Sequence, residues 1–282
     1  MSTILIADSG STKCEWCLLR NGKKKKIFTR GISPYFLNAA QIQDLLQKEL
    51  LPKLKNILVD ELYFYGTGLS NQENSKLLSV ALKKVFSGTI IKVETDILGA
   101  AKGLCGHSKG IACILGTGSN SCYFNGNKII KNSPGLGFIL GDEGSGAYMG
   151  RKVVQHYLYK TFDEELHVAF DNKYKTSRAE ILDAVYKGDL ANRYLASYSI
   201  FLSENRGHFM VENIIEDSIN DFFYQHLCKY SESWLHPINF TGTVAYTFRD
   251  VIKDICHSYE MELGNIYKQP MDGLVKYHQT KN

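Results

Sequence analysis

The sequence lacks the features that mark membrane, secreted and nucleic-acid-binding proteins. No apolar run approaches the roughly 20 residues that a membrane-spanning helix needs. Met1-Ser2-Thr3 leads directly into a short apolar run without a basic segment, so no signal peptide is expected. The 33 basic and 29 acidic residues are nearly balanced, whereas nucleic-acid binding usually needs a concentrated basic face. We therefore expect a cytoplasmic protein with neither a membrane nor a nucleic-acid partner.

Several well-known site motifs are also missing. The chain has no G-x-x-x-x-G-K-[ST] phosphate loop, no G-x-S-x-G frame around Ser119 or Ser145, and no H-E-x-x-H among its eight histidines. Its seven cysteines are scattered and odd in number, which favours reduced thiols. Cys14 and Cys17 have the spacing of a metal knuckle, but residues three apart in a strand face opposite sides. No second such pair accompanies them, so we expect buried structural thiols there.

Two hydroxyl-rich turns between apolar strands are the most informative feature that is present. The first is Asp8-Ser9-Gly10-Ser11-Thr12-Lys13, and the related second is Gly116-Thr117-Gly118-Ser119-Asn120. Both lead to an Asn-Gly pair, Asn21-Gly22 and Asn125-Gly126, which is a strong hairpin signature. A carboxylate, hydroxyls and glycine-flanked backbone N–H groups are the parts of a phosphate-and-magnesium cradle. The run Lys23 to Lys26 after the first hairpin is read as a solvated arm, with anion steering as the alternative.

The periodicity of the remaining chain predicts an α/β fold. Strands are expected at about 3–7, 14–20, 25–29, 62–65, 90–93, 111–115, 121–124, 128–131 and 238–241. Helices are expected from Asn38 until Pro52, around 77–85, several times between 147 and 230, near 248–262, and at the C-terminus. The Asn-Gly hairpins exclude a purely parallel sheet. Since no low-complexity linker separates the halves, the boundary near residue 100 should be a compact hinge.

Asp96 stands where a predicted strand passes into a predicted helix. A carboxylate at that position commonly serves only as a helix N-cap. It is also placed to act as a general base that takes the proton from a hydroxyl as its oxygen attacks phosphorus. The two roles are compatible in geometry, and the sequence leaves both open.

A third glycine-rich stretch runs from Pro134 to Gly146 and contains Asp142 and Glu143 just before a predicted helix. The two acids could merely complement the helix dipole. That interpretation does not explain five glycines, which indicate that the backbone approaches a ligand closely. Carboxylates there could hold sugar hydroxyls through charge-assisted hydrogen bonds.

Taken together, these motifs resemble those of the N-acetylglucosamine kinases. That family groups with the BadF/BadG/BcrA/BcrD-type ATPases in the actin–hexokinase–Hsp70 superfamily. The resemblance rests on five segments in the same order: 8–13, Thr95-Asp96 with Gly99-Ala100, 115–120, Gly141-Asp142-Glu143-Gly144-Ser145-Gly146, and Gly242-Thr243-Val244-Ala245. It implies two ribonuclease-H-like domains with a nucleotide cleft between them. The expected domains are 1–102 with 265–282, and 103–264 with a helical insertion, the terminal helix returning to the first.

The resemblance also implies roles for individual residues. Asp8 would hold Mg²⁺ through water and Asp96 would be the catalytic base. ATP and its phosphates would be bound by Asp8, Gly10, Ser11, Thr12, Lys13, Gly116, Thr117, Gly118, Gly242 and Thr243. The sugar would be bound by Asn38, Asp96, Ser119, Asn120, Gly135, Leu136, Gly137, Asp142 and Glu143. Eukaryotic members have an aromatic residue where this chain has Leu136, and a double glycine where it has Gly242-Thr243.

The leading hypothesis is a cytoplasmic ATP- and Mg²⁺-dependent sugar kinase that phosphorylates N-acetylglucosamine or a related amino sugar at O6. N-acetylglucosamine, glucosamine and N-acetylmuramic acid all fit the sequence, and the superfamily is compatible with a homodimer. One alternative is an ATP-driven dehydratase activator that holds an iron–sulfur cluster between subunits, with Cys105, Cys113 and Cys122 as ligand candidates. Another is a catalytically silent sugar sensor, which the presence of Asp96 disfavours.

Overall fold

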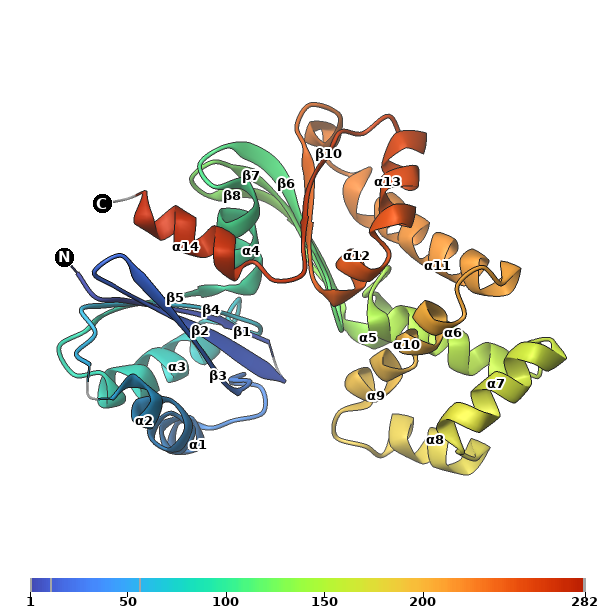
Figure 1. Ribbon diagram of the computed structural model, residues 1–282, viewed down its shortest axis with the longest axis horizontal. Helices are drawn as coiled ribbons and strands as arrows, with labels where there is room; N and C mark the ends of the chain where they lie inside the picture. The colour runs from blue at the N-terminus through green and yellow to red at the C-terminus, as the bar shows by residue number, and fades with distance from the viewer. Residues whose placement is uncertain (1, 11, 56, 281–282) are drawn as a thin grey trace. The chain divides into compact units, whose positions relative to one another are not determined.

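A computed structural model describes residues 2–10, 12–55 and 57–280. The chain divides into two compact units, residues 1–107 with 270–282 and residues 108–269. Each unit contains one five-stranded mixed sheet with helices packed against it (Figure 1). The expected α/β class and the pair of similar sheets are confirmed.

The sheet of the first unit has the strand order β3-β2-β1-β4-β5. Strand β1 is antiparallel to β2 but parallel to β4, and β4 is parallel to β5. Asn21 and Gly22 form the predicted two-residue turn, with φ values of 49° and 74°. The strands are β1 (Ile4–Ser9), β2 (Lys13–Arg20), β3 (Lys23–Arg30), β4 (Glu61–Gly66) and β5 (Ile90–Thr95).

Helices cover both faces of this sheet because its strands are apolar on both sides. Helices α1, α2 and α3 lie on one face of the sheet and α14 on the other (Figure 1). Leu5 and Trp16 belong to the core with the first three helices, whereas Ile6 and Tyr65 belong to the core with α14. Helix α14 also packs against α4, so the C-terminal end of the chain completes the first unit. The helices are α1 (Ala39–Leu45), the π-helical turn η1 (Leu46–Leu50), α2 (Leu51–Leu54), α3 (Gln72–Val85), α4 (Asp96–Cys105) and α14 (Met271–Gln279).

The expected helix end at Pro52 is wrong. Pro52 lies in the first turn of α2, where a missing N–H costs little, and the π-helical turn η1 precedes it. The helical segment ends instead at Lys55, whose φ of 53° is left-handed.

The sheet of the second unit repeats the arrangement with the order β10-β9-β6-β7-β8. Its strands are β6 (Lys109–Leu115), β7 (Ser119–Asn125), β8 (Ile129–Ser133), β9 (Ile238–Thr241) and β10 (Leu263–Tyr267). Strand β10, which pairs in parallel with β9, is absent from the sequence prediction. Its short Leu-Gly-Asn-Ile-Tyr sequence has a weak strand pattern, and the expected domain boundary after residue 264 falls inside it.

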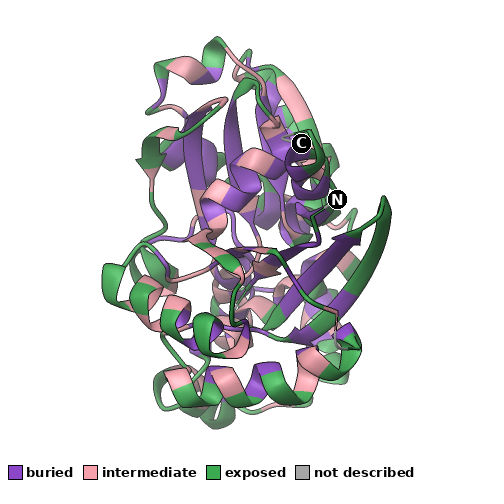
Figure 2. Ribbon diagram, turned by 90° about the vertical axis from the view of Figure 1, so that its left-hand side faces the viewer, coloured by how far each residue is buried: buried purple, intermediate pink, exposed green. Residues whose placement is uncertain are grey.

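One large apolar core joins this sheet to the surrounding helices. Figure 2 shows strands that are largely buried, while the helices alternate between buried and exposed residues. The helices are α5 (Gly137–Leu140), α6 (Gly146–Leu158), α7 (Glu164–Tyr174), α8 (Arg178–Tyr186), α9 (Ala191–Ser197), α10 (Ser199–Glu204), α11 (Phe209–Phe222), η2 (Phe223–Leu227), η3 (Ser231–Trp234), α12 (Thr243–Thr247) and α13 (Arg249–Ser258). Within the described ranges of both units, no helix is long and apolar enough to cross a membrane.

Candidate active site

The first unit presents two carboxylates at the carboxyl ends of parallel strands. Ser9, Gly66 and Thr95 are paired across β1, β4 and β5, so they form one row at the end of the sheet. Asp8 precedes the first member of this row and Asp96 follows the last. The carboxyl ends of parallel strands are where α/β sheets bind ligands.

Asp8 has an unusual electrostatic environment. Burial is the largest cause that raises the pKa of Asp8, and the neighbouring carboxylates of Asp96 and Glu15 also raise it. Together they bring the pKa to about 7. Asp8 and Glu15 are cross-strand partners on β1 and β2, so their side chains point to the same face. Three acidic groups therefore lie close enough to destabilise one another's charges, and a cation near Asp8 would relieve this repulsion.

Glu15 is a member of this acidic group that the sequence prediction missed. It is 3% exposed, and among the described residues its cationic partner is Lys26, with Nζ 3.3 Å from Oε1. Lys26 also contacts Asp272 at the start of α14, at 3.1 Å. The sequence signal for Glu15 is a charged residue inside the otherwise apolar strand segment 14–19. Its place beside Asp8 follows only from the pairing of β1 with β2.

Asp96 is the first residue of α4 and is not the N-cap. Thr95 caps the helix, because its Oγ1 accepts a hydrogen bond from the N–H of Leu98 at 3.3 Å. Asp96 Oδ1 accepts the N–H of Ile97 at 2.8 Å. Burial raises the pKa of Asp96, while backbone N–H groups partly oppose the rise. A raised pKa makes this carboxylate a stronger base than an ordinary aspartate.

Gly10, just after the end of β1, has open space around it among the described residues. The N–H of Gly10 donates to the carbonyl of Lys13 at 3.1 Å, and a β-carbon on Gly10 would meet only that oxygen, at 3.8 Å. Thr12 and Lys13 are exposed, and the Lys13 ammonium lies 3.9 Å from the centroid of the Phe28 ring. Ser11 was also predicted to bind phosphate, but it lies outside the described residues.

Asn38, a predicted sugar-binding residue, has a structural role in the first unit. It is the exposed N-cap of α1, and its Oδ1 accepts the N–H of Gln41 at 3.0 Å. The N–H of Asn38 in turn donates to Gln41 Oε1 at 2.9 Å, which completes a capping box. Neither contact uses the side-chain nitrogen Nδ2 of Asn38.

In the second unit, the turn of Gly116, Thr117 and Gly118 is fixed to the start of α6. The N–H of Gly146 donates to the carbonyl of Gly116 at 2.8 Å, and the N–H of Ala147 donates to that of Thr117 at 3.1 Å. The structure thus joins the second hydroxyl-rich turn to the end of the 134–146 stretch.

Asp142 lies at the centre of this region. It is 8% exposed with a φ of 58°, and its carboxylate accepts the N–H groups of Ser119 and Gly137. Burial raises the pKa of Asp142, and these two N–H groups oppose the rise. A β-carbon on Gly135 would lie 2.3 Å from the carbonyl oxygen of Ser119 and 2.9 Å from Asp142 Oδ1. The glycine is therefore required for the backbone to pass this carboxylate.

Ser119 supplies a buried polar group that has no partner among the described residues. Its hydroxyl is buried and makes no hydrogen bond to any described residue. Such a buried hydroxyl is costly unless a ligand or water satisfies it. Next to it, Asn120 Oδ1 accepts a hydrogen bond from Asn132 at 2.9 Å. Leu136 is 62% exposed and packs little against the unit.

The turn at Gly242 and Thr243, which was predicted to bind ATP, lies against the turn of Gly116 to Gly118. The φ of Gly242 is 121°, its N–H donates to the carbonyl of Tyr267, and a β-carbon there would lie 2.1 Å from the carbonyl oxygen of Leu115. The turn at Gly242 and the exposed Thr243 therefore lies directly against the turn that begins at Gly116. Segments 116–120, 135–143 and 242–243 meet within one unit.

Known structures match this chain over nearly its whole length. The structure of a "putative N-acetylglucosamine kinase" from Porphyromonas gingivalis matches with a TM-score of 0.94 and 38% identity, covering 98% of this chain and 99% of that one. The chain belongs to the N-acetylglucosamine kinase-like family. No protein-family model and no curated protein matches the sequence.

More distant matches show that this family shares its fold with other proteins. A "putative N-acetylglucosamine kinase" from Chromobacterium violaceum matches with a TM-score of 0.71 at 15% identity, covering 98% of this chain and 99% of that one. A "putative N-acetylmannosamine kinase" from Listeria monocytogenes matches with 0.52 at 14% identity, covering 99% and 100%. At these identities the matches establish the fold alone, the actin-like ATPase fold expected from the sequence.

The acidic group of this family member fits a hard cation that is bound largely through water and phosphate oxygens. Among the described residues no three His, Cys, Asp or Glu side chains are arranged to hold a metal ion. Mg²⁺ needs only one or two carboxylates when phosphates and water complete its shell. Asp8, with Glu15 beside it, supplies that donor chemistry.

Two of the three candidate cluster ligands, Cys113 and Cys122, are poorly placed for a cluster shared between subunits, whereas Cys105 is partly buried at the end of α4. Cys113 and Cys122 are completely buried, and the pairing of Ala112 with Cys122 puts the two thiols on opposite faces of the sheet. Cys14 and Cys17 likewise face different cores, as predicted. A thiol buried inside a sheet cannot reach a ligand held at a subunit surface.

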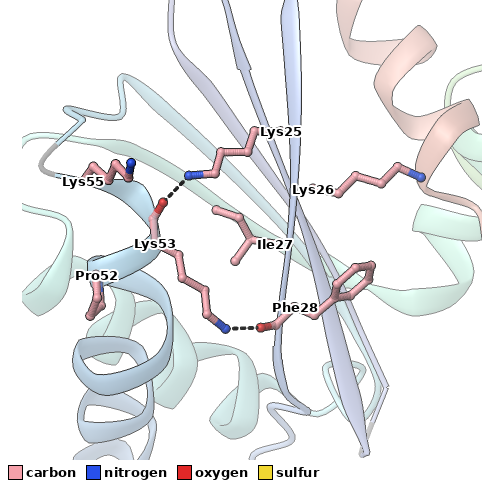
Figure 3. Close-up of a pocket in the computed structure, with 7 residues that line it drawn as sticks. All are labelled: Lys25, Lys26, Ile27, Phe28, Pro52, Lys53 and Lys55. Carbon is pink, nitrogen blue, oxygen red and sulfur yellow. Dashed lines mark hydrogen bonds between the residues drawn. The ribbon is translucent and has the colours of Figure 1, made fainter.

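Two residues of the lysine run, Lys25 and Lys26, line an open groove of about 480 Å³ between β3 and α2. Figure 3 shows Lys25 and Lys53 among the side chains of this groove. Lys25 Nζ donates to the carbonyl of Lys53 at 2.5 Å, and Lys53 Nζ donates to that of Phe28 at 2.7 Å. The first contact satisfies a carbonyl in the last turn of α2, so the lysines tie the hairpin arm to this helix.

Proposed function

We propose that this protein is an ATP-dependent kinase that transfers the γ-phosphoryl group to O6 of N-acetylglucosamine or a related amino sugar. Membership of the family supports the sugar-kinase activity. The observation that carries the assignment of residues is Asp96, a half-buried carboxylate with a raised pKa, next to Asp8 at the ends of parallel strands.

In this proposal Asp96 accepts the proton of the attacking sugar hydroxyl and orients the oxygen toward the γ-phosphorus. Its raised pKa favours proton transfer, and the Ile97 N–H keeps the carboxylate oriented. Asp8 would hold the Mg²⁺ of MgATP, and this ion would supply the positive charge that neutralises the phosphate oxygens. Gly10, Ser11, Thr12, Lys13, Gly116, Thr117 and Gly118 bind the phosphates, and Gly242 with Thr243 contacts the nucleoside.

In this proposal the sugar is bound by the carboxylate-and-glycine region of the second unit, and Asn38 remains a predicted sugar-binding residue. Asp142 and Glu143 accept hydrogen bonds from sugar hydroxyls, and the unpartnered Ser119 hydroxyl gains a partner. Gly135 and Gly137 let the backbone approach the ring, while Leu136 and Asn120 line it. This arrangement recognises a hydroxyl-rich ligand.

The test is sugar-dependent ADP release from purified protein with MgATP and a panel of neutral and amino sugars. We expect the highest kcat/KM with an amino sugar. We also expect no turnover of its 6-deoxy analogue, because that analogue lacks the attacking oxygen. Sugar-independent ATP hydrolysis with no phosphorylated sugar would overturn the proposal, and turnover of the 6-deoxy analogue would overturn the O6 assignment.

A further inference from the structure

His226 is a buried histidine that no part of the proposed reaction uses. It is 3% exposed and lies in the π-helical turn η2, which continues α11. Its ring stacks on Phe222 with the centroids 4.6 Å apart and the planes 21° apart. Single π-helical turns occur frequently at functional sites.

The two ring nitrogens face the two ends of the glycine-rich stretch. Nε2 lies 3.3 Å from Glu143 Oε2, and Nδ1 lies 3.2 Å from the carbonyl oxygen of Ser133. Both oxygens are acceptors, and burial lowers the pKa of His226, which favours the neutral ring with a single N–H. With that N–H on Nε2 the ring donates to Glu143, and Nδ1 can accept from the Ser121 hydroxyl, which lies 3.4 Å away. One side chain therefore connects the residue before Pro134 to the residue after Asp142.

Neighbouring contacts fix the same two ends. Ser133 donates its N–H to the hydroxyl of Tyr230, which lies 2.9 Å from the Ser121 hydroxyl. Gly144, with a φ of 70°, passes so close to α11 that a β-carbon would lie 2.8 Å from the β-carbon of Phe222. The end of α11 and η2 thus forms a support beneath segment 133–144.

We infer that His226 is a positioning residue for the sugar site, since it holds Ser133 and Glu143 and so fixes segment 133–143. This inference rests on the proposed function only for the identity of the ligand. With Oε2 engaged by the imidazole, Glu143 has Oε1 available for a sugar hydroxyl, because the structure gives that atom no hydrogen bond to a described residue. A carboxylate with a fixed orientation loses less entropy on binding than a mobile one.

The test compares His226→Leu with His226→Gln, whose amide nitrogen can still reach Glu143. Loss of a hydrogen bond to a charged group corresponds to roughly 10- to 100-fold in binding. We expect His226→Leu to raise the sugar KM by about that factor with the ATP KM unchanged, and His226→Gln to stay within about threefold. The control is His278→Gln, a buried histidine of the first unit that contacts Tyr65, which should lower the melting temperature only.

Hydrogen–deuterium exchange separates this inference from the proposed function. His226→Leu should accelerate exchange across 133–143, whereas His278→Gln should not. If the wild-type protein phosphorylates no sugar but this acceleration is seen, the function fails and the positioning role stands. Unchanged exchange in 133–143, or a His226→Leu variant that loses stability but keeps its sugar KM, would overturn the inference.

Discussion

Gly118 lies so close to Asp142 that a β-carbon on Gly118 would be 2.8 Å from Asp142 Oδ2. This distance is shorter than any ordinary contact of a methyl group with a carboxylate. Gly118 belongs to the turn expected to bind phosphate, and Asp142 is expected to bind sugar. Because the two are in contact, a larger residue at position 118 must move the Asp142 carboxylate.

The first prediction concerns Gly118→Ala. The added methyl group should displace the Asp142 carboxylate from the N–H groups of Ser119 and Gly137, and raise the sugar KM by about tenfold or more. Gly116→Ala is the comparison, because among the described residues other than its two chain neighbours no atom lies within 4 Å of its β-carbon position. It should affect the ATP KM instead. Steady-state kinetics with each substrate varied checks both, and equal effects on the two KM values would contradict this division of roles.

The second prediction concerns the general base. Asp96→Asn should lower kcat by a factor of roughly 10² to 10⁴ while leaving ATP binding nearly unchanged. The amide oxygen of asparagine can still accept the N–H of Ile97, so α4 should start normally. Turnover and calorimetric titration with a non-hydrolysable ATP analogue are the measurements. Sugar phosphorylation at the normal rate would show that Asp96 is not the base.

The third prediction follows from the pKa of Asp8. The folded protein holds this proton up to about pH 7, whereas the unfolded chain loses it near the ordinary value of 3.8. The folded state therefore binds more protons between these values, and its stability should fall as the pH rises through that window. Melting temperatures of Asp8→Asn should show less of this loss. Parallel pH profiles for wild type and variant would contradict the assignment.

Magnesium gives a related fourth prediction. At pH 8 the ionised carboxylates of Asp8, Glu15 and Asp96 repel one another. A cation bound beside them should therefore stabilise the folded protein. MgCl₂ with ADP should therefore raise the melting temperature of wild-type protein more than ADP alone. Asp8→Asn should lose most of this added increment. If the variant gains as much as the wild type, Asp8 does not contribute to the cation site.

The fifth prediction concerns the buried charge of Glu15. Lys26→Met should destabilise the protein by about 2 kcal/mol, because it leaves a carboxylate in the core without its cation. Adding Glu15→Gln should recover much of the loss. Asp272→Asn should have a small effect, since that contact is largely exposed. Thermal unfolding of the three variants measures this, and a harmless Lys26→Met would show that Glu15 does not depend on the ion pair.

Local sequence patterns predicted the hairpin at Asn21-Gly22 because the turn chemistry is contained in two residues. They failed at Pro52, where a π-helical turn changes the local backbone, and at Leu263–Tyr267, whose strand character comes from pairing with β9. The strand register and helix packing that support the site are likewise non-local. No pattern in the sequence indicated that Glu15 faces Asp8 or that His226 faces Glu143.

The sequence by itself determined the α/β class, the two hydroxyl-rich turns, and the set of glycines and acids, because these follow from periodicity and residue chemistry. The tertiary structure decided what each group contacts. It placed Thr95, not Asp96, as the N-cap of α4, brought Gly242 against Leu115, and buried the Ser119 hydroxyl without a partner. Burial and the approach of distant segments set pKa values and steric limits, and neither can be read from spacing along the chain.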